Sequence, residues 1–270
     1  MEIQALKQVL QENGIVGAGG AGFPTYAKLD ERAEIILMNC AECEPLLKLH
    51  RQLMEQRAEE ILRTFDGIAQ AVGAGEAVIG IKREYKSAVK AIERYIDRYS
   101  HMRVQLLDSA YPMGDEVVLI YEATGRVIRP GGLPIEEGVA VFNVETVYNV
   151  YRALEKQTPV VDKLVSVVGE VSHPVTVRVP IGSSIRDVVA HAGEILVKNP
   201  AYLIGGPMMG NLQTDTDVVT KTTNAVIVLD KSHSLIQRKD RNAAIDLKRA
   251  ASACCQCETC TSLCPRHALG

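Results

Sequence analysis

Apolar residues in the first part of the chain fall into two patterns. Short continuous runs of Ile, Val and Leu predict buried strands, and they lie at 34–39, 77–81, 104–107 and 138–142. Between and around these runs, apolar residues recur every three or four positions. This spacing predicts helices at 2–12, 46–71, 84–99, 115–124 and 145–156. Strands that alternate with helices predict a largely parallel sheet, so we expect a Rossmann-like α/β domain over residues 1–158.

The pattern changes after Thr158-Pro159. The apolar runs become shorter and richer in Val and Thr, which predicts strands at 164–168, 175–179, 201–204 and 225–229, with one helix over about 184–193. This mixture predicts a small α+β domain over residues 159–235. A further helix over 240–253 leads into a cysteine-rich stretch, so we treat residues 236–270 as a third segment.

Composition narrows the class of protein. Hydrophobic residues make up 47% of the 270 positions, but aromatic residues only 4% and Trp is absent, so the core must be aliphatic. A net charge of −3 argues against a nucleic-acid partner. No apolar run approaches the roughly 18 residues of a membrane span. Seven cysteines, mostly clustered near the end of the chain, fit a reducing cytoplasm and metal ligation better than disulfides.

The cysteine cluster has the spacing C-x2-C-x2-C-x3-C. Its members are Cys254, Cys257, Cys260 and Cys264, and Pro265 follows directly. This run is typical of bacterial ferredoxins, in which the thiolates hold a [4Fe–4S] cluster. A zinc site is the alternative, although zinc-binding cysteine pairs are usually separated by a longer loop. The spacing therefore favours an iron–sulfur site and a role in carrying electrons.

The position of the fourth cysteine raises a question about the length of the protein. In two-cluster ferredoxins this cysteine ligates the other cluster. No second cysteine run follows before Gly270. Either one cluster closes locally on Cys264, or the chain is a fragment of a longer protein that continues beyond this point. We expect the fragment.

A glycine-rich loop lies near the start of the chain, with Gly17, Gly19, Gly20 and Gly22 within six positions and Lys28 shortly after. Glycine lets backbone N–H groups approach a phosphate closely, and a lysine can add charge. The loop has neither the Walker sequence nor the Rossmann position, because a helix rather than a strand precedes it. A flexible loop without a ligand is the alternative.

Polar residues follow three of the predicted strands. Asn39–Pro45 come after the first strand, Tyr111–Glu116 begin the helix after the third, and Phe142–Thr146 end the fourth. In open α/β sheets, ligands bind at the carboxyl ends of the strands. Taken singly, Asp115 and Thr146 could be helix caps, and the acidic residues near Pro45 could form a solvated loop. Taken together with the glycine loop, they favour a cofactor crevice.

These same segments resemble a known family. Gly17–Lys28 resembles the FMN loop of the NADH-binding flavoprotein subunit of respiratory complex I, and Asn39–Pro45, Gly114–Glu116 and Asn143–Thr146 resemble its other flavin and NADH segments in the same order. A closer similarity, to the RnfC proteins of Rnf complexes and to PduS-type cobalamin reductases, is carried by Ala41–Leu46, Gly131–Pro134 and Ile204–Gly210. The absence of an N-terminal extension before the loop favours the cobalamin reductase type.

The resemblance implies a role for each matching position. It implies a phosphate cradle of Gly17, Gly19, Gly20 and Gly22, with Lys28 near the phosphate or the flavin. It implies an FMN site lined by Asn39, Glu42, Tyr111, Gly114, Asp115, Asn143 and Thr146. The residues implied to face the nicotinamide nucleotide are Phe23, Glu44 and Glu116. Ala18 and Ala41 stand where complex I has arginine and an acidic residue, so contacts there differ from the complex I pattern.

The family also implies the domains and the activity. It implies a Rossmann-like FMN and NADH domain, a β-grasp (SLBB) domain and ferredoxin-type [4Fe–4S] clusters. Electrons would pass from NADH through FMN and the clusters to a cobalamin, without a catalytic side chain. The implied partners are a cobalamin-handling enzyme, a bacterial microcompartment shell or other electron-transfer subunits. Two alternatives remain: an RnfC-like subunit of a membrane complex, and a non-catalytic module that docks a corrinoid or a partner.

Overall fold

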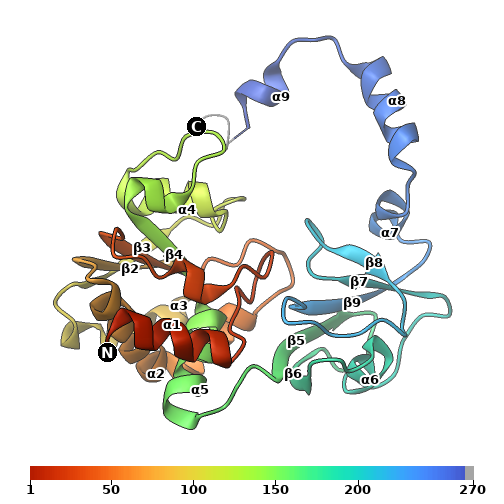
Figure 1. Ribbon diagram of the computed structural model, residues 1–270. Coiled ribbons are helices and arrows are strands. Elements are labelled where there is room, and N and C mark those ends of the chain that lie inside the picture. Colours follow the sequence, from red (N-terminus) through yellow and green to blue (C-terminus); the bar gives the residue numbers. More distant parts are fainter. Residues whose placement is uncertain (265–270) are drawn as a thin grey trace. The chain divides into compact units, whose positions relative to one another are not determined.

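The computed structural model describes residues 1–264, and these form two compact units (Figure 1). The first unit contains Met1–Cys43 and Lys48–Asp162. The second contains the described residues from Lys163 onward together with the short segment Glu44–Leu47. Each unit has its own sheet and its own buried core.

The first unit is built on a four-stranded sheet in which every strand pair is parallel. The strand order is β3-β2-β1-β4, with β1 at Ile35–Asn39, β2 at Glu76–Lys82, β3 at Met102–Leu107 and β4 at Val139–Asn143. Because β1 lies between β2 and β4, Leu37 sits opposite both Val78 and Val141. The strands β1, β2 and β4 are buried on both faces and need continuous apolar sequence, which explains why the runs of Ile, Val and Leu predicted them. The edge strand β3 buries only Met102 and Leu107.

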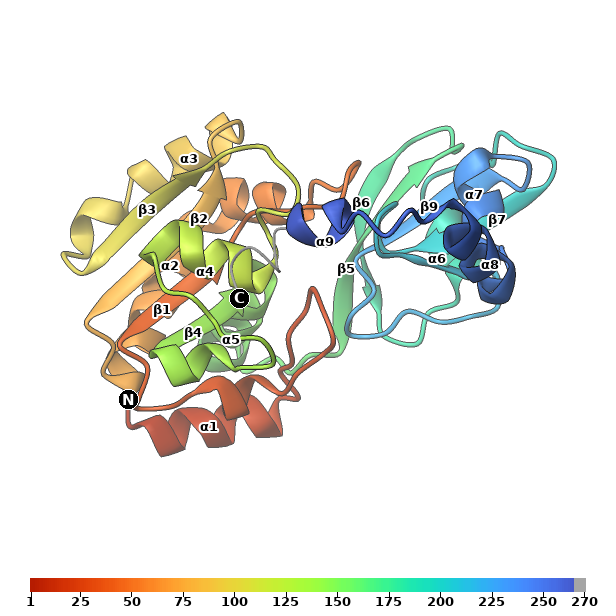
Figure 2. The same ribbon diagram turned by 90° about the horizontal axis from the view of Figure 1, so that it is seen from above.

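Helices cover the sheet on both faces. The helix α4 (Glu116–Thr124) contacts β1 and β2, and its Leu119 and Ile120 share a buried core with Leu37 and Val78. Side chains alternate along a strand, so Ile36 and Met38 point to the opposite face, where they are also fully buried. The remaining helices pack on one another, with α2 between α3 and α5 (Figure 2). They are α1 (Ile3–Glu12), α2 (Leu49–Val72), α3 (Lys86–Glu93) and α5 (Val144–Lys156).

Local signals position the ends of these helices. Asp115 accepts hydrogen bonds from the backbone N–H groups of Val117 and Val118, so it caps α4. Asn143 caps α5 in the same way, through the N–H of Glu145. Asn143 is the last residue of β4, and Asp115 lies in the connection that follows β3, so both helices begin at the carboxyl edge of the sheet. Short 3-10 turns lie at Thr25–Lys28, Ile96–Arg98 and Pro134–Glu137.

The second unit has a mixed five-stranded sheet in the order β6-β5-β9-β7-β8. Its strands are β5 (Asp162–Gly169), β6 (Val175–Pro180), β7 (Pro200–Ile204), β8 (Asn211–Gln213) and β9 (Ala225–Asp230). The strands β5 and β9 are parallel, whereas β7 runs antiparallel to both β8 and β9. Helix α6 (Ile185–Ala190) packs its Val188 into the main core, and α7 (Ser234–Lys239) places Ile236 in a smaller core with Leu203.

Of the described residues, 243–264 contribute no buried side chain to either core. The cysteine-rich segment follows α8 (Ala243–Ala253) and includes the short helix α9 (Thr259–Ser262), and neither helix buries a side chain. Among residues 1–264, none of the helices combines the length and the apolar character that a membrane crossing requires. The predicted α/β fold class is confirmed, while β8 and α7 are elements that the sequence patterns did not predict.

Candidate functional site

The glycine loop forms one wall of a cleft of about 280 Å³ in the first unit. The rest of the wall comes from the carboxyl ends of β1 and β4 and the first turns of α4 and α5, as expected for an open α/β sheet. The cleft brings together most of the residues predicted to bind a cofactor. Its lining residues are Gly17, Gly19, Gly20, Ala21, Gly22, Phe23, Thr25, Lys28, Asn39, Glu116, Val141, Phe142, Asn143 and Thr146.

The loop is held at both of its ends. The backbone N–H of Gly17 donates to the carbonyl of Phe23 at 2.9 Å, which closes the loop into a hairpin. The N–H of Ala18 donates to the hydroxyl of Thr146 at 3.0 Å, which fixes the loop to the start of α5. Gly22 has φ of 71°, a conformation that favours glycine. A Cβ atom built on Gly20 meets no protein atom within 4 Å, so the space beside this residue is open to a ligand.

Lys28 supplies the positive charge of the cleft, and it is the one cationic side chain among the described lining residues. Its Nζ donates to Glu116 Oε1 at 3.2 Å and to the carbonyl of Val141 at 3.0 Å. The same Nζ lies 6.0 Å from the centre of the half-exposed Phe23 ring. Glu116 on α4 and Val141 on β4 therefore hold the positive charge of Lys28 next to the glycine loop.

Thr25 is a lining residue that the sequence analysis missed. Its side chain is buried, yet among the described residues its hydroxyl has no hydrogen-bond partner. A buried hydroxyl without a partner is costly unless a ligand or water satisfies it. The glycine amides, the Lys28 charge and this hydroxyl together fit an anionic cofactor such as a flavin mononucleotide. The available sequence signal was its position, directly after Gly22-Phe-Pro.

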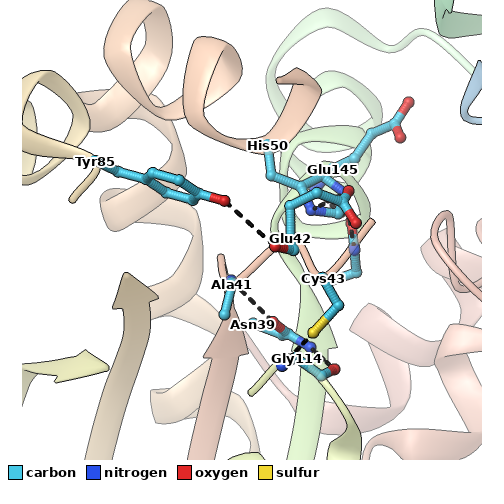
Figure 3. Close-up of polar contacts among 9 residues, drawn as sticks. Asn39, Ala41, Glu42, Cys43, His50, Tyr85, Gly114 and Glu145 are labelled. Carbon is cyan, nitrogen blue, oxygen red and sulfur yellow. Dashed lines mark hydrogen bonds and ion pairs between the residues drawn. The ribbon is translucent and has the colours of Figure 1, made fainter. Parts of the chain in front are cut away.

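The loop after β1 is fixed by a second set of contacts, drawn in Figure 3. Asn39 donates from Nδ2 to the carbonyl of Gly114 at 2.9 Å and accepts from the N–H of Ala41 at 3.0 Å. The N–H of Gly114 donates to the sulfur of Cys43 at 2.7 Å. Burial raises the pKa of the Cys43 thiol, and it raises the pKa of Tyr85 to about 12, so the Tyr85 hydroxyl keeps its proton and donates to the carbonyl of Glu42.

Replacing Gly114 with alanine should displace this loop. A Cβ atom there would lie 2.1 Å from the carbonyl oxygen of Ala41 and 2.9 Å from the sulfur of Cys43, and the first of these is backbone that cannot rotate away. We expect Gly114→Ala to lower the free energy of unfolding by about 2 kcal/mol, measured by urea denaturation. The control is Gly75→Ala, where a Cβ meets no atom within 4 Å. Equal stability of the two variants would contradict the proposed crowding.

Some of the predicted cofactor residues do not line the cleft in this structure. Glu42 faces His50, with 3.3 Å between Glu42 Oε2 and His50 Nδ1. Glu44 accepts hydrogen bonds from the N–H groups of Met208 and Met209, at 2.7 Å each, within the second unit. Asp115 caps α4, as described above, and Tyr111 is exposed. The backbone of Gly114 forms hydrogen bonds with Asn39 and Cys43 and so supports the loop after β1. Direct contact of these residues with a flavin or a nucleotide stays a prediction.

A second cleft, of about 380 Å³, adjoins the first, and the two share Phe23, Lys28, Glu116 and Val141. Its other charged lining residues are Asp30 and Arg32. The Arg32 guanidinium donates hydrogen bonds to the Asp30 carboxylate, from Nε to Oδ1 at 3.0 Å and from Nη2 to Oδ2 at 2.7 Å. These hydrogen bonds from Arg32 lower the pKa of Asp30 to about 2, so the carboxylate carries its charge at neutral pH. The sequence analysis did not identify this cleft.

The cysteine run is accessible but is not gathered around one point. Cys254, Cys257 and Cys260 are exposed and Cys264 is half-buried, and within residues 1–264 no three potential ligands lie close enough to hold a metal ion. Hydrogen bonds from the hydroxyl and the amide of Thr259 lower the pKa of Cys257 to about 7, which favours the thiolate that metals bind. Four thiols at this spacing suit iron in their chemistry. Pro265 lies outside the described residues.

Comparison with known families agrees with this geometry. Residues 10–152 match the Nuo51 FMN-binding domain, and residues 164–212 match the SLBB domain. The first match covers the glycine loop and the whole parallel sheet, and the second covers most of the mixed sheet.

Several curated proteins are similar along the whole chain. The chain is 44% identical over 270 residues to the cobalamin reductase PduS of Citrobacter freundii, and 46% identical over 266 residues to that of Salmonella typhimurium. It is 31% identical over 273 residues to one component of the Na(+)-translocating ferredoxin:NAD(+) oxidoreductase complex of Acetobacterium woodii. These matches cover 100%, 98% and 99% of this chain, but only 59%, 58% and 59% of the relatives, so the chain spans about three fifths of their length.

A solved structure gives the same picture of the fold. A chain of the NAD+-reducing [NiFe]-hydrogenase in the air-oxidized state superimposes with a TM-score of 0.72 at 26% sequence identity. The match covers 86% of this chain and 47% of the hydrogenase chain. The predicted resemblance is therefore confirmed by sequence and by structure.

Proposed function

Because the chain belongs to the family that carries the Nuo51 FMN-binding domain, we propose that it is a flavin-dependent oxidoreductase that passes electrons from NADH through FMN to iron–sulfur clusters. The observation that carries the proposal is the cleft at the carboxyl edge of the parallel sheet. It combines glycine amides, the charge of Lys28 and the unsatisfied hydroxyl of Thr25 in one wall. This combination suits the phosphate and the polar ring edge of FMN.

Each group in the cleft has a defined task in this proposal. The amides of the loop Gly17–Gly22 bind the phosphate, because glycine allows the backbone to approach it closely. Lys28 neutralises part of the phosphate charge, and Thr25 gains the partner that it lacks. Asn39 and Asn143 present amide groups from the ends of β1 and β4. When bound, FMN supplies the ability to take two electrons together and to release them one at a time.

The second cleft is the proposed place for the remaining part of NADH. Because it shares Phe23, Lys28, Glu116 and Val141 with the first cleft, a dinucleotide whose nicotinamide faces the flavin can extend into it. The Asp30 carboxylate on its wall can accept a hydrogen bond from a ribose hydroxyl. The same carboxylate repels the additional phosphate of NADPH, since Arg32 is already engaged by Asp30. NADH is therefore the proposed donor.

The variant Asp30→Asn tests this choice of donor. This substitution removes the negative charge and weakens the hydrogen bonds that hold Arg32. It should therefore raise kcat/KM for NADPH relative to NADH by about 10-fold, equivalent to about 1.4 kcal/mol. Steady-state reduction of an artificial acceptor with each nucleotide measures the ratio. The control is Glu31→Gln, an exposed carboxylate next in the chain that does not line the cleft. An unchanged ratio in Asp30→Asn would show that Asp30 does not face the ribose.

The proposal for the electron-transfer steps after FMN rests on the similar proteins described above. We propose that Cys254, Cys257, Cys260 and Cys264 supply ligands to [4Fe–4S] clusters in the whole protein, and that the final acceptor is a cobalamin, as the name of the PduS relatives indicates. The similarity to components of ion-translocating complexes makes other electron-transfer subunits the second class of partner. A cytoplasmic location, in association with a bacterial microcompartment, belongs to the same proposal.

Anaerobic visible spectroscopy tests the proposed function. The FMN-loaded chain should show a structured flavin band in the blue that bleaches when NADH is added. A chain that holds FMN but is not bleached by NADH or NADPH would contradict the oxidoreductase proposal and would favour a docking module for a corrinoid or a partner. A chain that binds no FMN would contradict the flavin site itself.

A further inference from the structure

A buried histidine lies behind the wall of the first cleft. His50 is in the first turn of α2, and its side chain is almost fully buried between the loop after β1 and the start of α5 (Figure 3). Its Nε2 lies 3.2 Å from Nδ2 of Asn143, and its Nδ1 lies 3.3 Å from Oε2 of Glu42. His50 does not line the cleft, whereas Asn143 does.

We propose that His50 is a positioning residue, whose ring, with its hydrogen on Nδ1, holds the carboxamide of Asn143 in the orientation that faces the flavin. The proposal rests on the proposed function for its ligand, but the state of the ring is a property of the chain itself. It concerns which atom of Asn143 faces His50, and which hydrogen of the Asn143 amide is left to bond with a ligand in the cleft.

The orientation of Asn143 follows from the cap of α5. Its Oδ1 accepts a hydrogen bond from the backbone N–H of Glu145 at 2.8 Å, so the carbonyl side of the amide is already engaged. The group that faces His50 is therefore the Nδ2 amide, which can only donate. His50 Nε2 must then be the acceptor and carry no hydrogen. In a neutral imidazole the hydrogen is in consequence on Nδ1.

Glu42 favours the same form of the ring. An N–H at Nδ1 points toward the Glu42 carboxylate, 3.3 Å away. Within the described residues no directed hydrogen bond reaches Nδ1, so this carboxylate is the nearby acceptor that a small adjustment can bring into line. Glu42 is itself held, because its carbonyl accepts from the Tyr85 hydroxyl at 3.3 Å. The chain of contacts Tyr85, Glu42, His50 and Asn143 thus connects the loop that follows β2 to the cleft wall.

The other form of the ring would disturb the cleft. A hydrogen on Nε2 would point at the amide hydrogens of Asn143, and two donors cannot bond to each other. Relief would require the Asn143 amide to turn over and give up its cap on α5. In the observed orientation, one Nδ2 hydrogen is directed to His50 and the second remains to donate to a ligand in the cleft. A donor facing the isoalloxazine ring stabilises the negative charge that develops on reduction.

Nuclear magnetic resonance of the flavin-free chain tests the state of the ring directly. Long-range ¹H–¹⁵N spectra of the ¹⁵N-labelled wild type, with the His50 signals identified by their loss in His50→Gln, should show a neutral ring with its hydrogen on Nδ1. A ring with its hydrogen on Nε2, or with hydrogens on both nitrogens, would overturn the proposal. This result does not depend on whether the chain binds FMN.

Two variants test the consequence for the cleft. Gln places an acceptor near the position of Nε2, whereas Leu removes it at similar volume. We expect His50→Leu to weaken FMN binding about 10-fold and to lower the midpoint potential of the bound flavin. We expect His50→Gln to bind FMN within about 2-fold of the wild-type affinity. Its midpoint potential should differ from that of the wild type by no more than the shift equivalent to that 2-fold change. Equal losses in the two variants would overturn the positioning role. Should His50→Leu fail to fold, the Gln variant and the tautomer of the wild type still decide the question.

A wild-type chain that holds the Nδ1 form but binds no FMN would instead contradict the proposed function and leave the His50–Asn143 contact intact. The two failures are therefore distinguishable.

Discussion

The variant Gly20→Leu is expected to bind FMN at least about 100-fold more weakly than wild type while keeping its fold. A Cβ atom at this position meets no protein atom within 4 Å, so the leucine side chain extends into the space beside the loop without straining the protein. In that space it blocks the approach of a phosphate to the loop amides. The loss of two charge-assisted hydrogen bonds costs about 3 kcal/mol, which corresponds to about 100-fold in affinity.

Quenching of FMN fluorescence on titration with the flavin-free chain measures this effect. The matched control is Gly67→Leu, because Gly67 is exposed on α2 and a Cβ there also meets nothing within 4 Å. That substitution should leave FMN binding unchanged and should stabilise the helix slightly, since leucine is a better helix former than glycine. Wild-type affinity in Gly20→Leu would place the phosphate elsewhere.

The variant Cys257→Ser is expected to lose the iron–sulfur cluster while keeping the flavin reaction. Serine offers no thiolate, and a [4Fe–4S] cluster depends on all of its sulfur ligands. After anaerobic reconstitution with iron and sulfide, the iron content and the broad brown absorption should fall to background. Bleaching of the bound flavin by NADH should continue, because the glycine loop and the cysteine run lie in different units.

The chain offers its own control for this experiment in Cys255. It is exposed like its neighbours but falls outside the C-x2-C-x2-C-x3-C spacing. Cys255→Ser should therefore retain iron and colour. Zinc in place of iron in the wild type, or equal iron content in the two serine variants, would contradict the assignment of the four ligands.

The sequence predicted β1, β2 and β4 well because these strands are buried on both faces, so their apolar character is continuous. The strand β8, at Asn211–Gln213, gave no such signal, because only its central residue is partly buried. Helix α7 was also not predicted, because it is only six residues long and buries a single side chain, Ile236. Elements that bury little leave little pattern, and their formation depends on neighbours already in place.

Much of the candidate site could be predicted because the glycine loop is a local feature. Asp115 caps α4, a local role that its place before the helix had already indicated. The positions of Glu42 and Glu44 could not be predicted in the same way. Each carboxylate had several potential partners, and the structure selects among them by contacts such as Glu44 with Met208, which are 164 residues apart. The roles of Thr25 and His50 were missed for a related reason: burial and the absence or presence of a partner emerge only in three dimensions.

A crystal structure of the chain with FMN bound tests the central claim most directly. The account predicts that the phosphate lies within hydrogen-bond distance of the amides of the loop Gly17–Gly22, with Lys28 and the hydroxyl of Thr25 in contact with the cofactor. A flavin bound at any other place, with the glycine loop and Thr25 still without a ligand, would contradict it.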